Sequence, residues 1–122
     1  GYFHQNIFKY ISTDWQVPNN GYDVINEQKQ IYGEIKNKHN TMNSSSSAKT
    51  YMKMQSTIMN NNSAKCYLIE VLAKRSQDKP WKVSIENESF SDKRIRRISM
   101  DKFYELVTGD SFAFKKLCEV LP

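Results

Sequence analysis

Alternating apolar and polar positions predict a β-hairpin in the first third of the chain. Two β-rich runs, Tyr22–Asn26 and Ile31–Lys38, follow turn-forming residues and are separated by a short polar stretch. Successive side chains of a strand point to opposite faces, so Glu34 and Lys36 share one face of the second run while its isoleucines take the other. The hairpin therefore presents charge on one side and apolar surface on the other.

Beyond the hairpin, the pattern changes between helical spacing and apolar runs. Tyr51, Met54 and Ile58 recur at the spacing of one helix face. The predicted elements are a helix at Ala48–Asn60, a buried central strand at Lys65–Ala73, a strand at Trp81–Ile85 with Arg94–Ser99 as its candidate hairpin partner, and helices at Met100–Thr108 and Ser111–Val120, the last capped by Asp110. Strands mixed with helices indicate an α/β (α+β) fold with a small mixed central sheet.

The composition is that of one globular domain spanning residues 1–122. The chain is 39% hydrophobic and 25% charged, and fifteen aromatic residues give its core enough bulk to need no disulfide. Cys66 and Cys118 each fall in an apolar segment, so we expect two buried free thiols. Free thiols fit a reducing cytoplasm, and no apolar run approaches the roughly 20 residues of a membrane span. Because the chain opens at Gly1 without methionine, we expect a C-terminal fragment of a longer protein.

The positive charge is concentrated in one window. The net charge is +5, yet Ile35–Ile69 contains no Asp or Glu. Five lysines lie in this window, and outside it thirteen basic residues balance thirteen acidic ones; the five are Lys36, Lys38, Lys49, Lys53 and Lys65. The absence of carboxylates suits a surface that a polyanion approaches. A solvated loop that happens to lack acids explains the window equally well.

The hairpin brings two acids and a lysine together. If its loop holds an even number of residues, Gln28-Lys29 or Glu27–Gln30, the register places Asp23 opposite Glu34. Paired carboxylates repel each other unless a cation lies between them, and a hard divalent ion with oxygen ligands is the natural candidate. Lys36 can then polarise a water or a phosphate oxygen, as phosphodiester hydrolysis requires. Taken alone, the pattern Asp-x10-Glu-x-Lys also fits a charged surface hairpin without any site.

Longer stretches of the sequence, beyond these three residues, resemble a known family. The runs Gly21–Asn26 and Ile31–Ser44, and later Cys66–Ala73 and Arg94–Pro122, resemble type II restriction endonucleases with the PD-(D/E)xK fold, in particular the group that cuts GGNCC sites. The resemblance implies a catalytic set of Asp23, Glu34 and Lys36, with Mg²⁺ held by Asp23, Glu34 and Ile35. It also implies a bacterial restriction-modification system, double-stranded DNA as partner and, since palindromic targets suit twofold symmetry, a homodimer. The eponymous motif has Pro where Asn20-Gly21-Tyr22 precedes the acid here.

The polar stretch after the candidate catalytic lysine is suited to contacts with DNA. Its short amide, hydroxyl and basic groups can read base edges or hold phosphates. The residues predicted to bind DNA, including two lysines further along, are Lys38, His39, Asn40, Asn43, Lys49 and Lys53. His39 fits the role of a general base or of a polar loop residue equally well. For Ser45–Ser47 we expect a solvated loop, and a second basic cluster at Arg94, Arg96 and Arg97 fits either a phosphate clamp or a solvated edge strand.

Two other classes of function remain open on the sequence. One is a nucleic-acid-binding module without catalysis, or a truncated nuclease-like domain that has lost activity. The other is a structural or protein-interaction domain, which predicts no salt-sensitive DNA binding. Metal-dependent cleavage would separate the enzyme from both.

Overall fold

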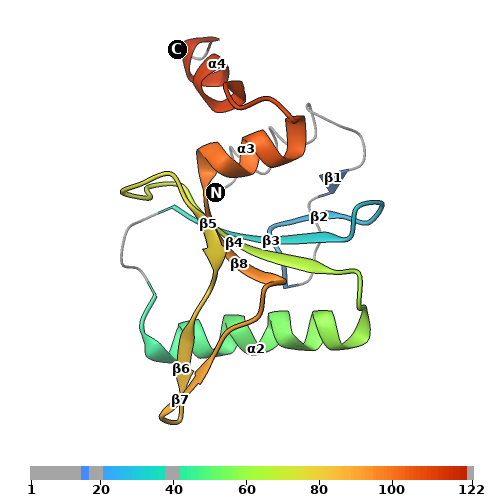
Figure 1. The fold of residues 1–122 in the computed structure, drawn as a ribbon, viewed down its shortest axis with the longest axis vertical. Helices are drawn as coiled ribbons and strands as arrows, with labels where there is room; N and C mark the ends of the chain where they lie inside the picture. Colours follow the sequence, from blue (N-terminus) through green and yellow to red (C-terminus); the bar gives the residue numbers. More distant parts are fainter. Residues whose placement is uncertain (1–14, 17–20, 38–41, 121–122) are drawn as a thin grey trace.

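The fold is a mixed α/β arrangement in three layers. The computed structural model describes residues 15–16, 21–37 and 42–120. One sheet lies in the middle, with helix α2 (Ser44–Asn60) against one face and helix α3 (Met100–Thr108) against the other, and helix α4 (Ala113–Val120) packs beyond α3 (Figure 1). The expected fold class, a mixed sheet flanked by helices, is therefore confirmed at the level of α/β architecture.

The main sheet combines antiparallel and parallel strands. Its order is β1-β2-β3-β4-β8-β5. The bounds are β1 Trp15–Gln16, β2 Val24–Asn26, β3 Ile31–Lys36, β4 Lys65–Glu70, β8 Ile95–Ser99 and β5 Asp78–Pro80. The two parallel pairs, β3 with β4 and β4 with β8, form the centre, and antiparallel strands flank them. As predicted, β4 is a buried central strand, although it ends at Glu70 rather than at Ala73.

Helix α2 starts earlier than its apolar pattern suggests. The sequence predicts a start at Ala48, but the helix begins at Ser44 because Asn43 caps it: the Asn43 side chain accepts the N–H of Ser46 at 2.9 Å, and the Ser46 hydroxyl accepts the N–H of Asn43. Ser45–Ser47, expected to be a loop, is the first turn of this helix. Tyr51, Met54 and Ile58 face the sheet and are buried, as their spacing predicts.

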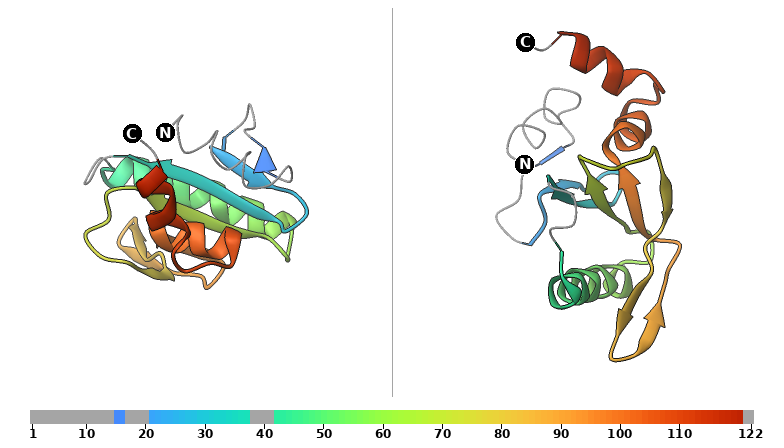
Figure 2. Two further views of the ribbon diagram at one scale, coloured as in Figure 1. Left: turned by 90° about the horizontal axis from the view of Figure 1, so that it is seen from above. Right: turned by 90° about the vertical axis from the view of Figure 1, so that its left-hand side faces the viewer.

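The second half of the sheet differs from the prediction. A separate two-stranded hairpin joins β6 (Val83–Ile85) to β7 (Glu88–Phe90) through a two-residue turn, Glu86-Asn87, in which both residues have positive φ. The predicted partner of Trp81–Ile85, Arg94–Ser99, instead forms β8, an internal strand between β4 and β5. The small hairpin extends beside α2 (Figure 2), where Tyr51 contacts the rings of Trp81 and Phe90.

Two apolar clusters hold the three layers together. On the α2 side the cluster includes Tyr51, Met54, Leu68 and Ile95, and on the α3 side it includes Ile69, Ile98 and Phe103. Cys66 belongs to the first cluster and is buried, as expected, but Cys118 is exposed. The prediction for Cys118 was wrong because α4 packs on the core through Phe114 and Leu117, which leaves the neighbouring position facing outward.

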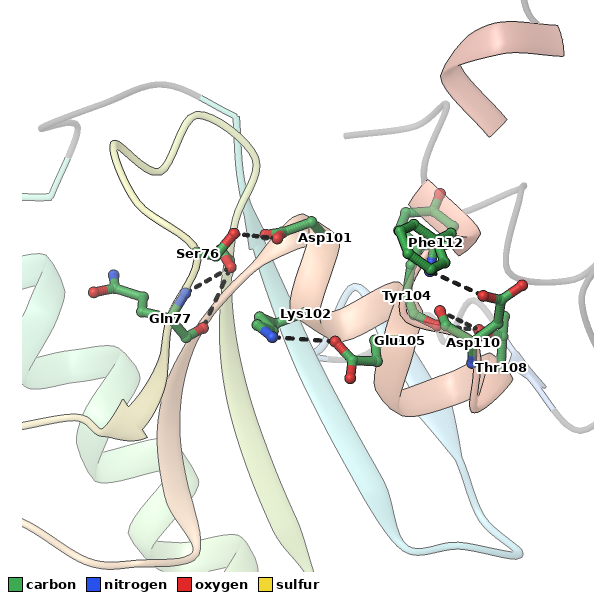
Figure 3. Close-up of polar contacts among 10 residues, drawn as sticks. Ser76, Gln77, Asp101, Lys102, Tyr104, Glu105, Thr108, Asp110 and Phe112 are labelled. Carbon is green, nitrogen blue, oxygen red and sulfur yellow. Dashed lines mark hydrogen bonds and ion pairs between the residues drawn. The ribbon is translucent and has the colours of Figure 1, made fainter. Parts of the chain in front are cut away.

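Helix α3 is fastened to the sheet at its first turn. Asp101 accepts a hydrogen bond from the Ser76 hydroxyl (Figure 3), and the backbone of Gln77 exchanges hydrogen bonds with Ser99. The helix ends at Gly109, which adopts the left-handed conformation with φ of 73°. Asp110 accepts the N–H of Phe112 at 2.9 Å in the turn before α4, which begins at Ala113 rather than at the predicted Ser111, so Asp110 does not directly precede the helix as predicted. Among the helices of the described ranges, none is long and apolar enough to cross a membrane.

Candidate active site

The hairpin forms with the register that the sequence predicts. The loop is Glu27–Gln30, an even number of residues, and Asn26 pairs with Ile31 while Val24 pairs with Gly33. Asn26 supports the turn by accepting the N–H of Lys29 at 3.0 Å. On β3, Glu34 and Lys36 therefore project toward α2, whereas Ile35 is buried on the α3 side.

Asp23 directly precedes β2 and lies beside β3. Its backbone N–H donates to the Gly33 carbonyl at 2.9 Å, and its carboxylate Oδ2 accepts the N–H of Ile35 at 2.7 Å. The sequence predicts that Asp23 is a strand residue directly opposite Glu34. The pairing of β2 with β3 instead starts at Val24, so Asp23 lies outside the strand. The Asp23 carboxylate accepts the Ile35 N–H, which in a continued strand would bind a backbone carbonyl. This hydrogen bond fixes the carboxylate beside the β3 backbone that carries Glu34.

Glu34 carries the second carboxylate and is largely buried. Its side chain is 17% exposed and lies 3.2 Å from the Lys53 ammonium of α2. Burial is the main cause of a raised pKa of Glu34; the Lys53 ammonium opposes this, and the negative charge of Asp23 raises the pKa further. The two carboxylates are thus close enough to repel each other, and the site favours a cation.

Lys36 follows Glu34 on the same face of β3 and also lowers the pKa of Glu34 through its charge. Its backbone carbonyl accepts the N–H of Val71 at 2.9 Å, and in the parallel register Lys36 lies next to Glu70 of β4. The strand thus holds Lys36 in a fixed place relative to Glu34, two residues nearer the carboxyl end of β3.

Backbone oxygens complete the set of possible metal ligands. The carbonyls of Gln30 and Lys36 accept N–H groups from the β4 side, whereas the Gly33 carbonyl and the Ile35 N–H turn toward Asp23. By the alternation of a strand, the carbonyl of Ile35 opens to the same side as Asp23. Within the described ranges, no three His, Cys, Asp or Glu side chains gather in a metal-binding group. Two carboxylates with a carbonyl still suit Mg²⁺, which keeps several water or phosphate ligands.

Comparison with known proteins gives the same family as the sequence resemblance. The model of the Eco47II restriction endonuclease family matches residues 1–122. The chain belongs to this family. It is 30% identical to the type II restriction enzyme Sau96I of Staphylococcus aureus and 28% identical to the type II restriction enzyme Eco47II of Escherichia coli. Both alignments cover all of this chain but only 50% and 55% of those enzymes, so the chain spans about half their length. No solved structure matches it.

The residues predicted to contact DNA in this restriction endonuclease family member fall into three groups. Lys38, His39 and Asn40 lie outside the described residues. Asn43 caps α2, and Lys49 is exposed on that helix, six residues further along. Lys53 reaches into the site itself: its ammonium contacts Glu34, donates to the Gly21 carbonyl and lies 4.7 Å from the centre of the Tyr22 ring. The sequence placed this lysine in the basic window but gave no sign of its contact with Glu34.

The basic cluster on β8 is paired with carboxylates. Arg94 binds Asp92, Arg96 binds Asp78, and Arg97 holds Glu70 through two hydrogen bonds of 2.8 and 3.0 Å. The alternative of a solvated edge strand is wrong, because β8 is internal to the sheet. The pairs of Arg96 and Arg97 connect β8 to β5 and β4, whereas Arg94 and Asp92 both lie in the turn that precedes β8.

Proposed function

We propose that this chain is the catalytic part of a type II restriction endonuclease with a PD-(D/E)xK site, which hydrolyses DNA phosphodiester bonds with Mg²⁺ in a bacterial restriction-modification system. The observation that carries the proposal is the placement of Asp23, Glu34 and Lys36 on one hairpin in a member of the Eco47II family. The type II enzymes among its relatives support the same activity.

In this proposal the metal is held by the Asp23 and Glu34 carboxylates with the Ile35 carbonyl. All three are hard oxygen donors, and Asp23 is already fixed by its hydrogen bond to the Ile35 N–H. Bound Mg²⁺ supplies a Lewis acid for the scissile phosphate and lowers the pKa of a bound water. Burial of Glu34 keeps the site partly shielded from solvent, which strengthens charge interactions within it.

Lys36 acts on the reacting groups. Its ammonium orients the attacking water and stabilises the negative charge that grows on the phosphate in the transition state. It cannot replace a metal ligand, because an ammonium group has donors only. Lys38, His39, Asn40, Asn43 and Lys49 then contact the DNA at the end of β3 and the start of α2, with a GGNCC-type site as the target of a cytoplasmic homodimer.

The decisive experiment is cleavage of plasmid DNA by the intact protein, with and without Mg²⁺. Asp23→Asn and Glu34→Gln should each lower cleavage by at least about 100-fold, whereas Glu27→Gln, in the exposed turn of the same hairpin, should leave it unchanged. Sequencing the cut ends identifies the site. Salt-sensitive DNA binding without Mg²⁺-dependent cleavage would instead identify a binding module, and absence of both would contradict any nuclease role.

A further inference from the structure

The Lys53 ammonium lies where a cation would be expected at this site. It is 3.2 Å from Oε2 of Glu34 and donates to the carbonyl of Gly21. The Tyr22 ring lies below it, with the centroid at 4.7 Å. A carboxylate oxygen, a carbonyl oxygen and a ring face form a cation-binding environment.

The surroundings of Lys53 are built by the fold rather than by a loose surface contact. Tyr22 is held by its hydroxyl, which lies 2.6 Å from Oγ1 of Thr57 on α2, and by ring contact with Tyr32. Gly21 has a positive φ of 74°, and a Cβ atom at this position would lie 3.5 Å from Cδ of Lys53. Helix and hairpin together therefore hold the ammonium against Glu34.

From this geometry we infer that Lys53 is an internal counter-ion of Glu34 that competes with a divalent cation for the same carboxylate. The inference rests on the proposed function, and it adds regulation of the metal site. Glu34 is shared by the two cations: while Lys53 occupies Oε2, fewer lone pairs face a metal, and the ammonium repels a dication. The flexible four-carbon stem lets Lys53 withdraw once the carboxylate is taken.

The test is direct binding of Mn²⁺ to the intact protein by isothermal titration calorimetry, without DNA. Lys53→Met should tighten binding by about five- to tenfold, the size expected from loss of one half-buried ion pair. Lys53→Arg keeps the charge and should stay within about twofold of wild type. Lys49→Met is the matched control: it removes one charge one turn earlier on α2, from an exposed position, and should leave metal affinity unchanged.

A second measurement is made on the wild-type protein, and it needs only the conservative variant Lys53→Arg, which keeps the charge, to assign one signal. The ammonium signal of Lys53 in a ¹H–¹⁵N spectrum, assigned by its loss in Lys53→Arg, should move when Mg²⁺ is added. An unmoved signal at saturating Mg²⁺ overturns the inference, as does equal or weaker Mn²⁺ binding by Lys53→Met. These results leave the proposed function intact. Absence of metal binding in every variant, together with absence of cleavage, overturns both.

Discussion

At the scale of single residues, Lys36 is the position whose role the proposal defines most sharply. Lys36→Ala should abolish cleavage while leaving DNA binding nearly intact, because the ammonium acts on charge that develops only in the transition state. Losing a preorganised charge of this kind costs on the order of 3 kcal/mol or more in activation energy, against roughly 1 kcal/mol or less for one exposed phosphate contact. The measurement pairs single-turnover cleavage in Mg²⁺ with equilibrium binding in Ca²⁺.

Lys29 provides the control for this prediction. It lies exposed in the turn of the same hairpin, so Lys29→Ala removes an equal charge from the same element without touching the site. Equal losses of cleavage and binding in Lys36→Ala would make Lys36 a DNA-binding residue only. Retained cleavage would remove it from the catalytic set.

Asp92 provides a pH-dependent test of stability. Hydrogen bonds from the Arg94 side chain are the main cause of a lowered pKa of Asp92. A carboxyl whose pKa is lower in the folded state stabilises the fold above its unfolded pKa, and this contribution is lost as the pH falls through the folded pKa. Asp92→Asn should therefore destabilise by about 1 kcal/mol or less at pH 7, and the difference from wild type should shrink below about pH 3.8, the ordinary value of an Asp carboxyl.

Urea unfolding at pH 7, 5 and 3 measures this difference. Glu88→Gln removes an exposed carboxylate from the neighbouring hairpin and should show no comparable cost at any of these pH values. If the cost of Asp92→Asn is the same at pH 3 as at pH 7, the ion pair with Arg94 is not its origin.

The residue-scale predictions from sequence were accurate where local geometry decides the outcome. Strand alternation and an even loop placed Glu34 and Lys36 on one face and Asp23 near them. They could not show that Asp23 would leave the strand to bind the Ile35 N–H. The contact of Lys53 with Glu34 joins residues nineteen positions apart through a helix packed across the sheet. No periodicity in the sequence encodes that packing.

At the scale of elements, the site depends on the close approach of β2, β3 and β4 around Gly33. A Cβ atom at this position would lie 2.8 Å from Cδ1 of Ile69 and 2.9 Å from Cγ2 of Val24. Both neighbours are fully buried core side chains with little room to move. Gly33→Ala should therefore destabilise the protein by about 1–3 kcal/mol, the usual cost of overpacking a core.

A double-mutant cycle distinguishes this clash from other effects of the substitution. Ile69→Val removes the Cδ1 atom that the new methyl would meet, so the double variant should recover part of the stability lost in Gly33→Ala, measured by urea unfolding. Strictly additive effects would show that contact with Cδ1 of Ile69 is not the origin of the cost. A Gly33→Ala protein as stable as wild type would show that the strands adjust to the methyl group at no cost.

Elements with strong local signals were predicted, and those that depend on distant pairing were not. β4 is apolar on both faces and was recognised as a central strand. The β6–β7 hairpin was missed because its strands are three residues long and Glu86, which is not a typical turn residue, takes a positive φ. β8 pairs in parallel with β4 across a long connection, whereas nearness in sequence favoured a hairpin with Trp81–Ile85.

At the scale of the whole molecule, the fold separates the lysines of the window Ile35–Ile69, which contains no Asp or Glu. Lys36 and Lys53 border the carboxylates, and Lys49 lies on α2 toward the end nearest the exit of β3 (Figure 1). Lys65 begins β4 and pairs with Ile31 at the hairpin end, away from Glu34. Among the described lysines of the window, Lys65 therefore does not belong to the surface that borders the site.

This division predicts different effects on the salt dependence of DNA binding. Each phosphate contact releases counter-ions, so its loss lowers the slope of log affinity against log salt by about 0.9. Lys49→Ala should reduce the slope by roughly one contact and weaken binding at low salt, because its exposed side chain lies on the helix that borders the site. Lys65→Ala removes the same charge from an equally exposed position remote from Glu34, so its slope should equal that of wild type.

Equilibrium binding in Ca²⁺ over a series of KCl concentrations measures both slopes. Equal reductions would mean that DNA responds to net charge alone, and an unchanged slope for Lys49→Ala would exclude the start of α2 from the DNA interface.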